Sequence, residues 1–414
     1  MMQTVEIEFM HEFGLQTLWY LHIQPPLFDF IRFALSMNPW SEIGYVAGVE
    51  FDRRLYIFYI FIYSCFNVLV YTWSKSLGLS KVLSLVVTAL WSIYPGNLAM
   101  ATLLDSTYLS AFLVAIFIFS IQETLRLRER KYFYLFIVFF ILATYTRTVF
   151  QIYILLFLPV ISFYLLTKIS DRRKPLVVAA ILGSILVFAL PLKQKILFGT
   201  TSTTTFAGQH KIEGIWYYPT KSELSQIDIQ DKYIDNARKY ENKFNNAWQV
   251  AWNIKYEELF RQIVIEKPNL VLNGVKKSSL QGLARLNIST QNYWANAIVG
   301  FVPWLDISAT FMIGKYYLAL GVFVVFAALL RLALQRKLCS WRDVFYYWPI
   351  YFSLLSIFLS IVVGSNRYEW TEAERLKFLI EFPVLIYLVS AVYWLFFFNV
   401  KESPLKSIDD DQIV

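Results

Sequence analysis

Several acidic side chains in this sequence could carry out acid–base chemistry. Glu6, Glu8 and Glu12 lie near the start of the chain, and Asp105 stands in the stretch ATLLDSTYL, just before a long apolar run. A carboxylate can deprotonate an acceptor hydroxyl, so these residues are candidates for general base catalysis. Simpler explanations stay open, because the three glutamates fit a solvated terminus and Asp105 fits a helix N-terminal cap.

Basic side chains supply the matching charge. Arg147 separates two apolar runs in ATYTRTVF, and Arg375 and Lys377 belong to the segment NRYEWTEAERLKF. A guanidinium suits a phosphate group, although an arginine at a membrane boundary can instead snorkel to the interface and the late segment can be a charge-balanced loop. Together with the carboxylates, these residues suit attack on a lipid-phosphate-linked sugar, with arginines holding the departing phosphate.

The elements that must position these residues are strongly apolar. The chain has 414 residues, of which 57% are hydrophobic, 18% aromatic and only 16% charged. Continuous apolar runs between short basic loops predict an all-helical, polytopic integral membrane protein, because helices satisfy their backbone polar groups within lipid. We expect about nine transmembrane helices, several of them shorter than the ~20 residues that an untilted span needs. They are Leu55–Trp73, Val82–Pro95, Tyr108–Gln122, Tyr132–Thr146, Val149–Leu166, Leu176–Pro191, Tyr316–Leu334, Val344–Val363 and Phe378–Phe398.

The distribution of charge predicts the topology. The formal net charge is +8, and the basic residues collect in every second connection between apolar runs, which indicates membrane orientation and no nucleic-acid partner. Basic loops are expected in the cytoplasm, which places the N-terminal segment, Lys193–Lys315 and Gly364–Lys377 on the outer face. An outer N-terminus followed by an odd number of spans also predicts a further transmembrane helix upstream of Met1.

We expect five regions along the chain. They are an extracytoplasmic N-terminal loop with interfacial helices (1–54), transmembrane helices (55–192), one large extracytoplasmic loop of amphipathic helices (193–315), C-terminal transmembrane helices (316–398) and a cytoplasmic tail (399–414). The large loop opens with the hydroxyl-rich stretch FGTTSTTTFAG. A helix is then expected from about Ile227 to Ile265 and should end at Pro268.

Aromatic side chains recur along that expected helix. Trp248, Trp252, Tyr256 and Phe260 are spaced about one helical turn apart. Such a stripe is typical of a helix that packs on the membrane surface or on a neighbouring helix, and a sugar-stacking platform is a third interpretation.

Metal-binding signals are weak. The chain has three histidines, His11, His22 and His210, and none of them forms a paired-ligand spacing, so no dedicated metal site is predicted. A divalent ion held by Glu6 or Glu8 together with Asp105 stays open as a cofactor.

In the order of these features the chain resembles the GT-C superfamily of integral-membrane glycosyltransferases, in particular the branch of protein O-mannosyltransferases and lipid A aminoarabinose transferases. The similar features are an acidic first outer loop, the element Gln24-Pro25-Pro26-Leu27, an aspartate before a later span (Asp105), a basic residue after the next apolar element (Arg147), and Glu374-Arg375 before a final span. The acidic pattern here is Glu-Ile-Glu, with no aspartate.

The resemblance implies a catalytic base in the first outer loop, best matched by Glu6 or Glu8. Asp105 would match a second acidic position, and Arg147 and Arg375 would match positions that contact the lipid phosphate. The expected activity is transfer of a sugar from a polyprenyl-phosphate donor to a glycan, lipid or protein acceptor at the outer face of a bacterial plasma membrane. A surface-polysaccharide polymerase or ligase, and a transporter or flippase for lipid-linked sugars, are the alternatives.

Overall fold

The computed structural model describes residues 4–40, 44–147, 152–169, 173–286, 348–364 and 370–397. All named elements in these ranges are helices, and the one β-bridge joins Met37 to Tyr45. An apolar bundle contains α4 (Gly48–Ser76), α5 (Lys81–Ile93), α6 (Pro95–Thr102), α7 (Ser106–Leu127), α8 (Arg130–Thr144), α9 (Ile152–Leu155), α10 (Phe157–Lys168), α11 (Arg173–Phe198), α20 (Trp348–Gly364) and α21 (Trp370–Phe397).

Three helices in the described ranges are long and apolar enough to cross a membrane: α4, α7 and α11. The bent pair formed by α5 and α6, which meet at 58°, would raise that number to four if it is one span. Shorter apolar helices run over Phe157–Lys168, Trp348–Ile357 and Phe378–Ser390, and the expected span Tyr316–Leu334 lies outside the described residues. The fold is therefore all-helical and compatible with an integral membrane protein, while the nine spans stay a prediction.

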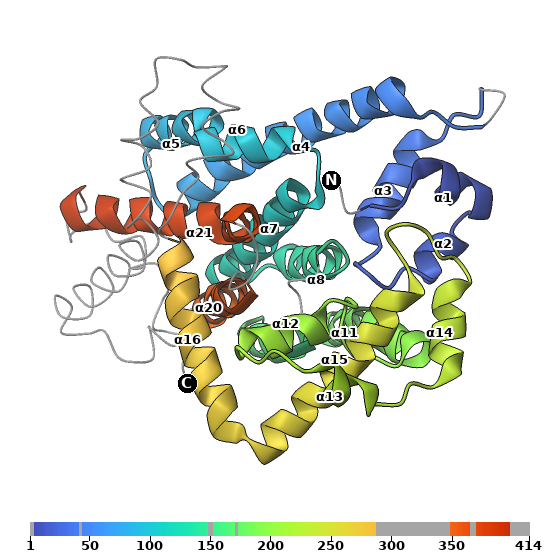
Figure 1. Ribbon diagram of the computed structural model, residues 1–414. Helices are drawn as coiled ribbons and strands as arrows, with labels where there is room; N and C mark the ends of the chain where they lie inside the picture. The colour runs from blue at the N-terminus through green and yellow to red at the C-terminus, as the bar shows by residue number, and fades with distance from the viewer. Residues whose placement is uncertain are drawn as a thin grey trace.

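Helix α7 lies at the centre of the bundle (Figure 1). Asp105 begins it as an N-cap, with the carboxylate accepting from the Thr107 N–H at 2.7 Å, and Arg128 ends it in the left-handed conformation. Of the most apolar 18-residue window in α7, 94% is buried, against 33% for α4 and for α11. The neighbours of α7 therefore shield it almost completely.

The outer helices of the bundle expose apolar side chains. Exposed residues recur along α4, α5 and α11, including Ile57, Phe61, Val82, Leu182 and Ile185. A water-soluble protein rarely shows so large an apolar surface. This surface is the one that lipid would cover.

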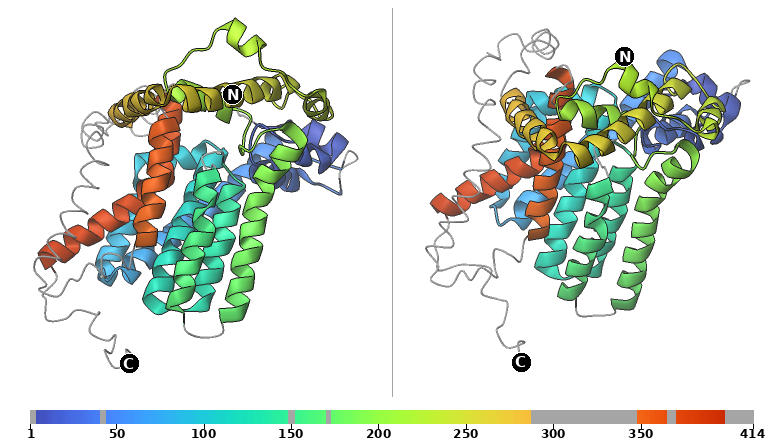
Figure 2. Two further views of the ribbon diagram at one scale, coloured as in Figure 1. Left: turned by 90° about the horizontal axis from the view of Figure 1, so that it is seen from below. Right: turned by 60° about the horizontal axis from the view of Figure 1, so that its bottom comes forward.

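The remaining helices, several of them amphipathic, gather at one end of the bundle, which we call the polar end (Figure 2). They are α1 (Ile7–Phe13), α2 (Gln16–Trp19), α3 (Leu27–Ser36), α12 (Ala207–Gly214), α13 (Lys221–Ser225), α14 (Asp231–Arg238), α15 (Ala247–Glu266) and α16 (Pro268–Leu286). The turn between α7 and α8, which carries several basic residues, lies at the opposite end (Figure 2). The N-terminal segment and the region after Phe198 thus share one end.

The prediction of one helix from about Ile227 to Ile265 is wrong in one respect: the region forms two helices. The first, α14, ends at Arg238, and α15 begins at Ala247. The Asn242 side chain accepts from the N–H groups of Phe244 and Asn245 at 2.9 and 2.8 Å, which forms a turn. Within α15 the aromatic stripe packs mainly on neighbouring helices. Trp252, Tyr256 and Phe260 surround a small core that α12 shares, whereas Trp248 is 60% exposed.

Candidate active site

The element Gln24-Pro25-Pro26-Leu27 fixes α3 against the end of α8. Neither proline can donate a backbone hydrogen bond, and Pro26 occupies the N-cap position of α3. The next residue, Leu27, donates its N–H to the carbonyl of Tyr145 at 2.8 Å, just beyond α8. The Pro-Pro turn therefore sets where the side chains of α3 lie relative to Arg147.

Asp29 and Arg32 form a buried ion pair on α3. The Asp29 Oδ1 atom accepts from Arg32 Nη1 at 3.0 Å and from the Val5 N–H at 3.2 Å, and Oδ2 accepts from Gln24 at 2.5 Å. Burial raises the pKa of Asp29, although the Arg32 charge and the hydrogen bonds favour the ionised form. Arg32 also donates to the Val5 carbonyl at 2.7 Å, while its buried Nε atom has no hydrogen-bond partner. The pair thus ties the start of the chain to α3.

Asp105 and Arg147 both lie at the start of α7. Arg147 is only 7% exposed and donates to the Thr107 hydroxyl at 2.7 Å and to the Ser106 hydroxyl at 3.4 Å. Asp105 directly precedes these hydroxyls and caps the same helix. A carboxylate and a guanidinium therefore share the polar end of the most buried helix.

Helix α4 contacts both groups of charged residues, through Tyr59 and Phe51. The Tyr59 hydroxyl donates to the backbone carbonyl of Asp105. The Arg32 guanidinium lies 5.6 Å from the centre of the Phe51 ring, which is also on α4. We call Asp29, Arg32, Tyr59, Asp105 and Arg147 the charged cluster.

The other predicted site residues are on α1 and α21 or next to them. Glu6 and Glu8 are exposed on α1, and Glu6 directly follows Val5, whose backbone contacts the ion pair on α3. Arg375 and Lys377 belong to the first part of α21, but their side chains lie outside what the structure describes. The next residue, Phe378, stacks on Tyr108 near the start of α7, with ring centroids 5.8 Å apart.

A second polar network lies in the region after α11. Glu257 on α15 accepts from the Thr200 hydroxyl at 2.6 Å, from Lys211 at 2.8 Å and from the Ser202 hydroxyl. Burial raises the pKa of Glu257, but Lys211 and the hydroxyl donors outweigh burial and hold that pKa below its ordinary value. The hydroxyl-rich stretch is thus a buried strap bonded to α15, a partnership that its sequence could not reveal.

The same strap holds the segment between α2 and α3. The Thr205 N–H donates to the His22 carbonyl at 3.0 Å, and the Thr204 hydroxyl donates to the Ile23 carbonyl at 2.5 Å. Asn245 accepts from the His22 N–H at 3.0 Å. Burial, together with the nearby Lys193 charge, lowers the pKa of His22 to about 3, so its ring is neutral at pH 7. These contacts lock the N-terminal segment onto the later region.

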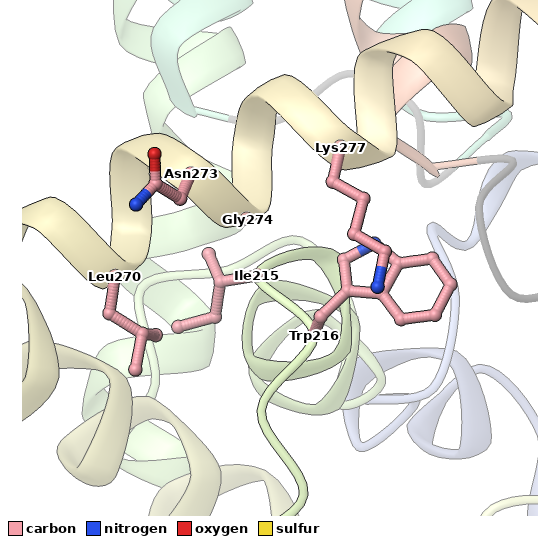
Figure 3. Close-up of a pocket in the computed structure, with 6 residues that line it drawn as sticks. All are labelled: Ile215, Trp216, Leu270, Asn273, Gly274 and Lys277. Carbon is pink, nitrogen blue, oxygen red and sulfur yellow. The ribbon is translucent and has the colours of Figure 1, made fainter.

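A surface hollow of about 460 Å³ lies between the end of α12 and α16 (Figure 3). Ile215, Trp216, Leu270, Asn273, Gly274 and Lys277 line it. The Lys277 ammonium lies 3.8 Å from the centre of the Trp216 ring. No residue of the charged cluster lines this hollow, so it offers no cavity to the candidate site.

Within the described part of the chain, no three His, Cys, Asp or Glu side chains come together as metal ligands. The divalent ion stays a prediction. Comparison with known proteins does not assign the site either. No protein-family model, curated protein or solved structure matches this chain.

Proposed function

We propose that this protein is a membrane glycosyltransferase of the GT-C type, which moves a sugar from a polyprenyl-phosphate donor to an acceptor on the extracytoplasmic face. The observation that supports this proposal is that Asp105 and Arg147 both lie at the start of α7, where Asp105 caps the helix and Arg147, 7% exposed, donates to the hydroxyls of Ser106 and Thr107. A donor that diffuses in the bilayer would present its phosphate at this depth. No nucleotide site is then required.

The proposed step forms one bond and breaks one bond. A carboxylate takes the proton of the acceptor hydroxyl, whose oxygen attacks the anomeric carbon of the sugar. The bond from that carbon to the phosphate oxygen breaks, and the lipid phosphate leaves with its charge held by Arg147, with Arg375 and Lys377 as further candidates. Asp105 is our first candidate for the base, and Glu6 and Glu8 are the others.

Transfer of radiolabelled sugar from a panel of polyprenyl-phosphate sugars tests the proposal in membranes that contain the full chain. Asn caps helices about as well as Asp, so Asp105→Asn should keep α7 intact while removing the base. We expect a loss of about 10²- to 10⁴-fold for the variant that lacks the true base. The set is completed by Glu6→Gln, Glu8→Gln and Glu12→Gln, and the control is Glu266→Gln, which changes an exposed residue of α15.

A separate variant tests whether Arg147 binds the lipid phosphate. Arg147→Lys keeps the positive charge but loses the planar fork, and we expect a loss of about 10²-fold or more in turnover. Absence of transfer from every donor by the well-folded parent would contradict the proposal. Donor movement across the membrane without transfer would favour a flippase, and transfer only from diphosphate-linked oligosaccharides would favour a polymerase or ligase.

A further inference from the structure

The junction of α15 and α16 forms an elbow at Lys267 and Pro268. Pro268 occupies the first position of α16, where the missing N–H costs nothing, so the chain bends there and starts a new helix. Both helices lie across the end of the bundle, and the elbow projects beyond the outline of the bundle when it is viewed along its axis (Figures 1 and 2). The elbow therefore overhangs the region that lipid would occupy.

Apolar side chains on the elbow are exposed in the part of the chain that the structure describes. Ile265 and Leu272 are 71% and 67% exposed, and Val264 and Val275 are 40% and 39% exposed. Leu272 and Val275 are three residues apart in α16 and so share one face of that helix. All four exposed aliphatic residues lie within residues 264–275, on the two helix segments that flank the bend, and we call them the apolar patch. Single scattered apolar residues are normal on protein surfaces, whereas a concentration of them indicates an interaction site.

The inner side of the elbow already has its own partners. Leu270, Val271 and Phe260 pack on the small core that α12 shares with α15. These contacts fix the shape of the elbow. The outward-facing apolar side chains take no part in them and are available to a partner outside this part of the fold.

Charge on the elbow indicates what that partner is. Lys267 and Lys276 are exposed near these apolar residues, and they outnumber the one exposed carboxylate there, Glu266. Apolar side chains flanked by lysines are typical of helices that lie in the headgroup layer of an anionic membrane.

We propose that the elbow, through Ile265, Leu272, Lys267 and Lys276, rests on the anionic phospholipid headgroups beside the bundle. This contact holds α15, and with it the hydroxyl-rich strap, at a fixed height above the membrane. The proposal depends on the membrane position of the bundle and not on sugar transfer. It can therefore fail or succeed independently of the proposed enzyme activity.

Site-directed fluorescence in lipid nanodiscs tests this contact on the full chain, with Cys65 and Cys339 replaced by serine. An environment-sensitive probe is attached to Ile265→Cys or Leu272→Cys. Ser222→Cys, exposed on α13 at the same end, is the aqueous control, and Leu182→Cys, exposed on α11, is the acyl-chain control. Only variants that keep the thermal stability of the parent are compared.

We expect nitroxide lipids labelled at the headgroup to quench the elbow probes at least twofold more than the Ser222 probe. The difference should shrink in nanodiscs without anionic lipid and in Lys267→Glu with Lys276→Glu. Elbow probes that match the Ser222 probe in every lipid would overturn the proposal. Probes shielded equally in detergent and in lipid would overturn it too, because protein would then cover the patch.

Discussion

At the residue scale, Glu257 shows how one carboxylate can organise a segment that looked like a polar loop. Three donors from the strap and from α12 converge on it, and Lys211 supplies the opposite charge at 2.8 Å. Removing one partner of such a network leaves hydroxyl and ammonium donors without their acceptor. The carboxylate should therefore contribute to stability as well as to shape.

The pH dependence of that contribution follows from the pKa of Glu257, which lies below its ordinary value. A lowered pKa means that the contribution is fully present above the ordinary pKa of about 4.3 and is lost as the pH falls through the lowered value. We expect Glu257→Gln to lower the free energy of unfolding by about 1 to 3 kcal/mol at pH 7. Thermal unfolding measured at decreasing pH should show this deficit shrink once the pH is below the ordinary value.

The neighbouring Glu258 provides the control. It pairs with Arg261 at 2.6 Å, but the arginine side chain is 69% exposed. An exposed pair of this kind contributes about 0 to 1 kcal/mol, so Glu258→Gln should leave the unfolding temperature nearly unchanged. Equal losses in the two variants would contradict a special role for Glu257.

The sequence pointed to some residues of these sites and missed others for a physical reason. Asp105 and Arg147 were candidates because charges at the ends of apolar runs are visible in sequence. Asp29 and Glu257 were not singled out, since their importance depends on partners such as Val5 and Lys211 that only the fold brings near. The catalytic roles of the candidates stay predictions.

At the scale of the element, Gly183 sets how closely α11 approaches its neighbours. A Cβ atom at this position would lie 2.6 Å from the Ile137 Cγ2 atom of α8 and 3.6 Å from the Leu158 Cδ2 atom of α10. Small residues allow membrane helices to pack this closely.

A larger side chain at this contact should force α11 away. We expect Gly183→Leu to destabilise the protein by about 1 to 3 kcal/mol, measured by thermal unfolding in detergent followed through tryptophan fluorescence. Leu182→Ile is the matched control, because Leu182 is 54% exposed on the same helix. If the unfolding temperature of Gly183→Leu shifts no more than that of the control, the interface accommodates the larger side chain without loss of stability.

Element boundaries were harder to predict than element types. Apolar runs gave helices throughout the described bundle, yet α4 begins at Gly48, seven residues before the expected span, and so includes Asp52-Arg53-Arg54. The proposed boundary between residues 54 and 55 therefore falls inside a helix. Polar residues extend helices beyond the lipid, and hydropathy alone cannot show where they stop.

At the scale of the whole molecule, the two ends of the bundle differ in character. The helices outside the apolar bundle gather at the polar end, and the basic turn between α7 and α8 lies at the other (Figure 2). This arrangement agrees with the topology expected from the charge distribution, which predicts that the polar end faces outward.

Cysteine labelling in intact cells tests that topology. In a chain without Cys65 and Cys339, a membrane-impermeant maleimide should label Glu12→Cys on α1 and Ser222→Cys on α13 without permeabilisation. It should label Glu129→Cys, in the turn between α7 and α8, only after permeabilisation. Labelling of Glu12→Cys and Ser222→Cys from opposite sides would rule out a common face for the two polar segments.

The enclosure of α7 has a consequence for how this protein can vary. Of the apolar window of α7, 94% is buried, against 33% for α11. Nearly every substitution in that window of α7 therefore changes a buried side chain. In a complete substitution scan scored by protein abundance, intolerance along α7 should be nearly uniform. Along α11 it should rise and fall with a period of about 3.6 residues. Substitutions that accumulate during evolution should therefore concentrate on the outer helices of the bundle, and few should fall on α7.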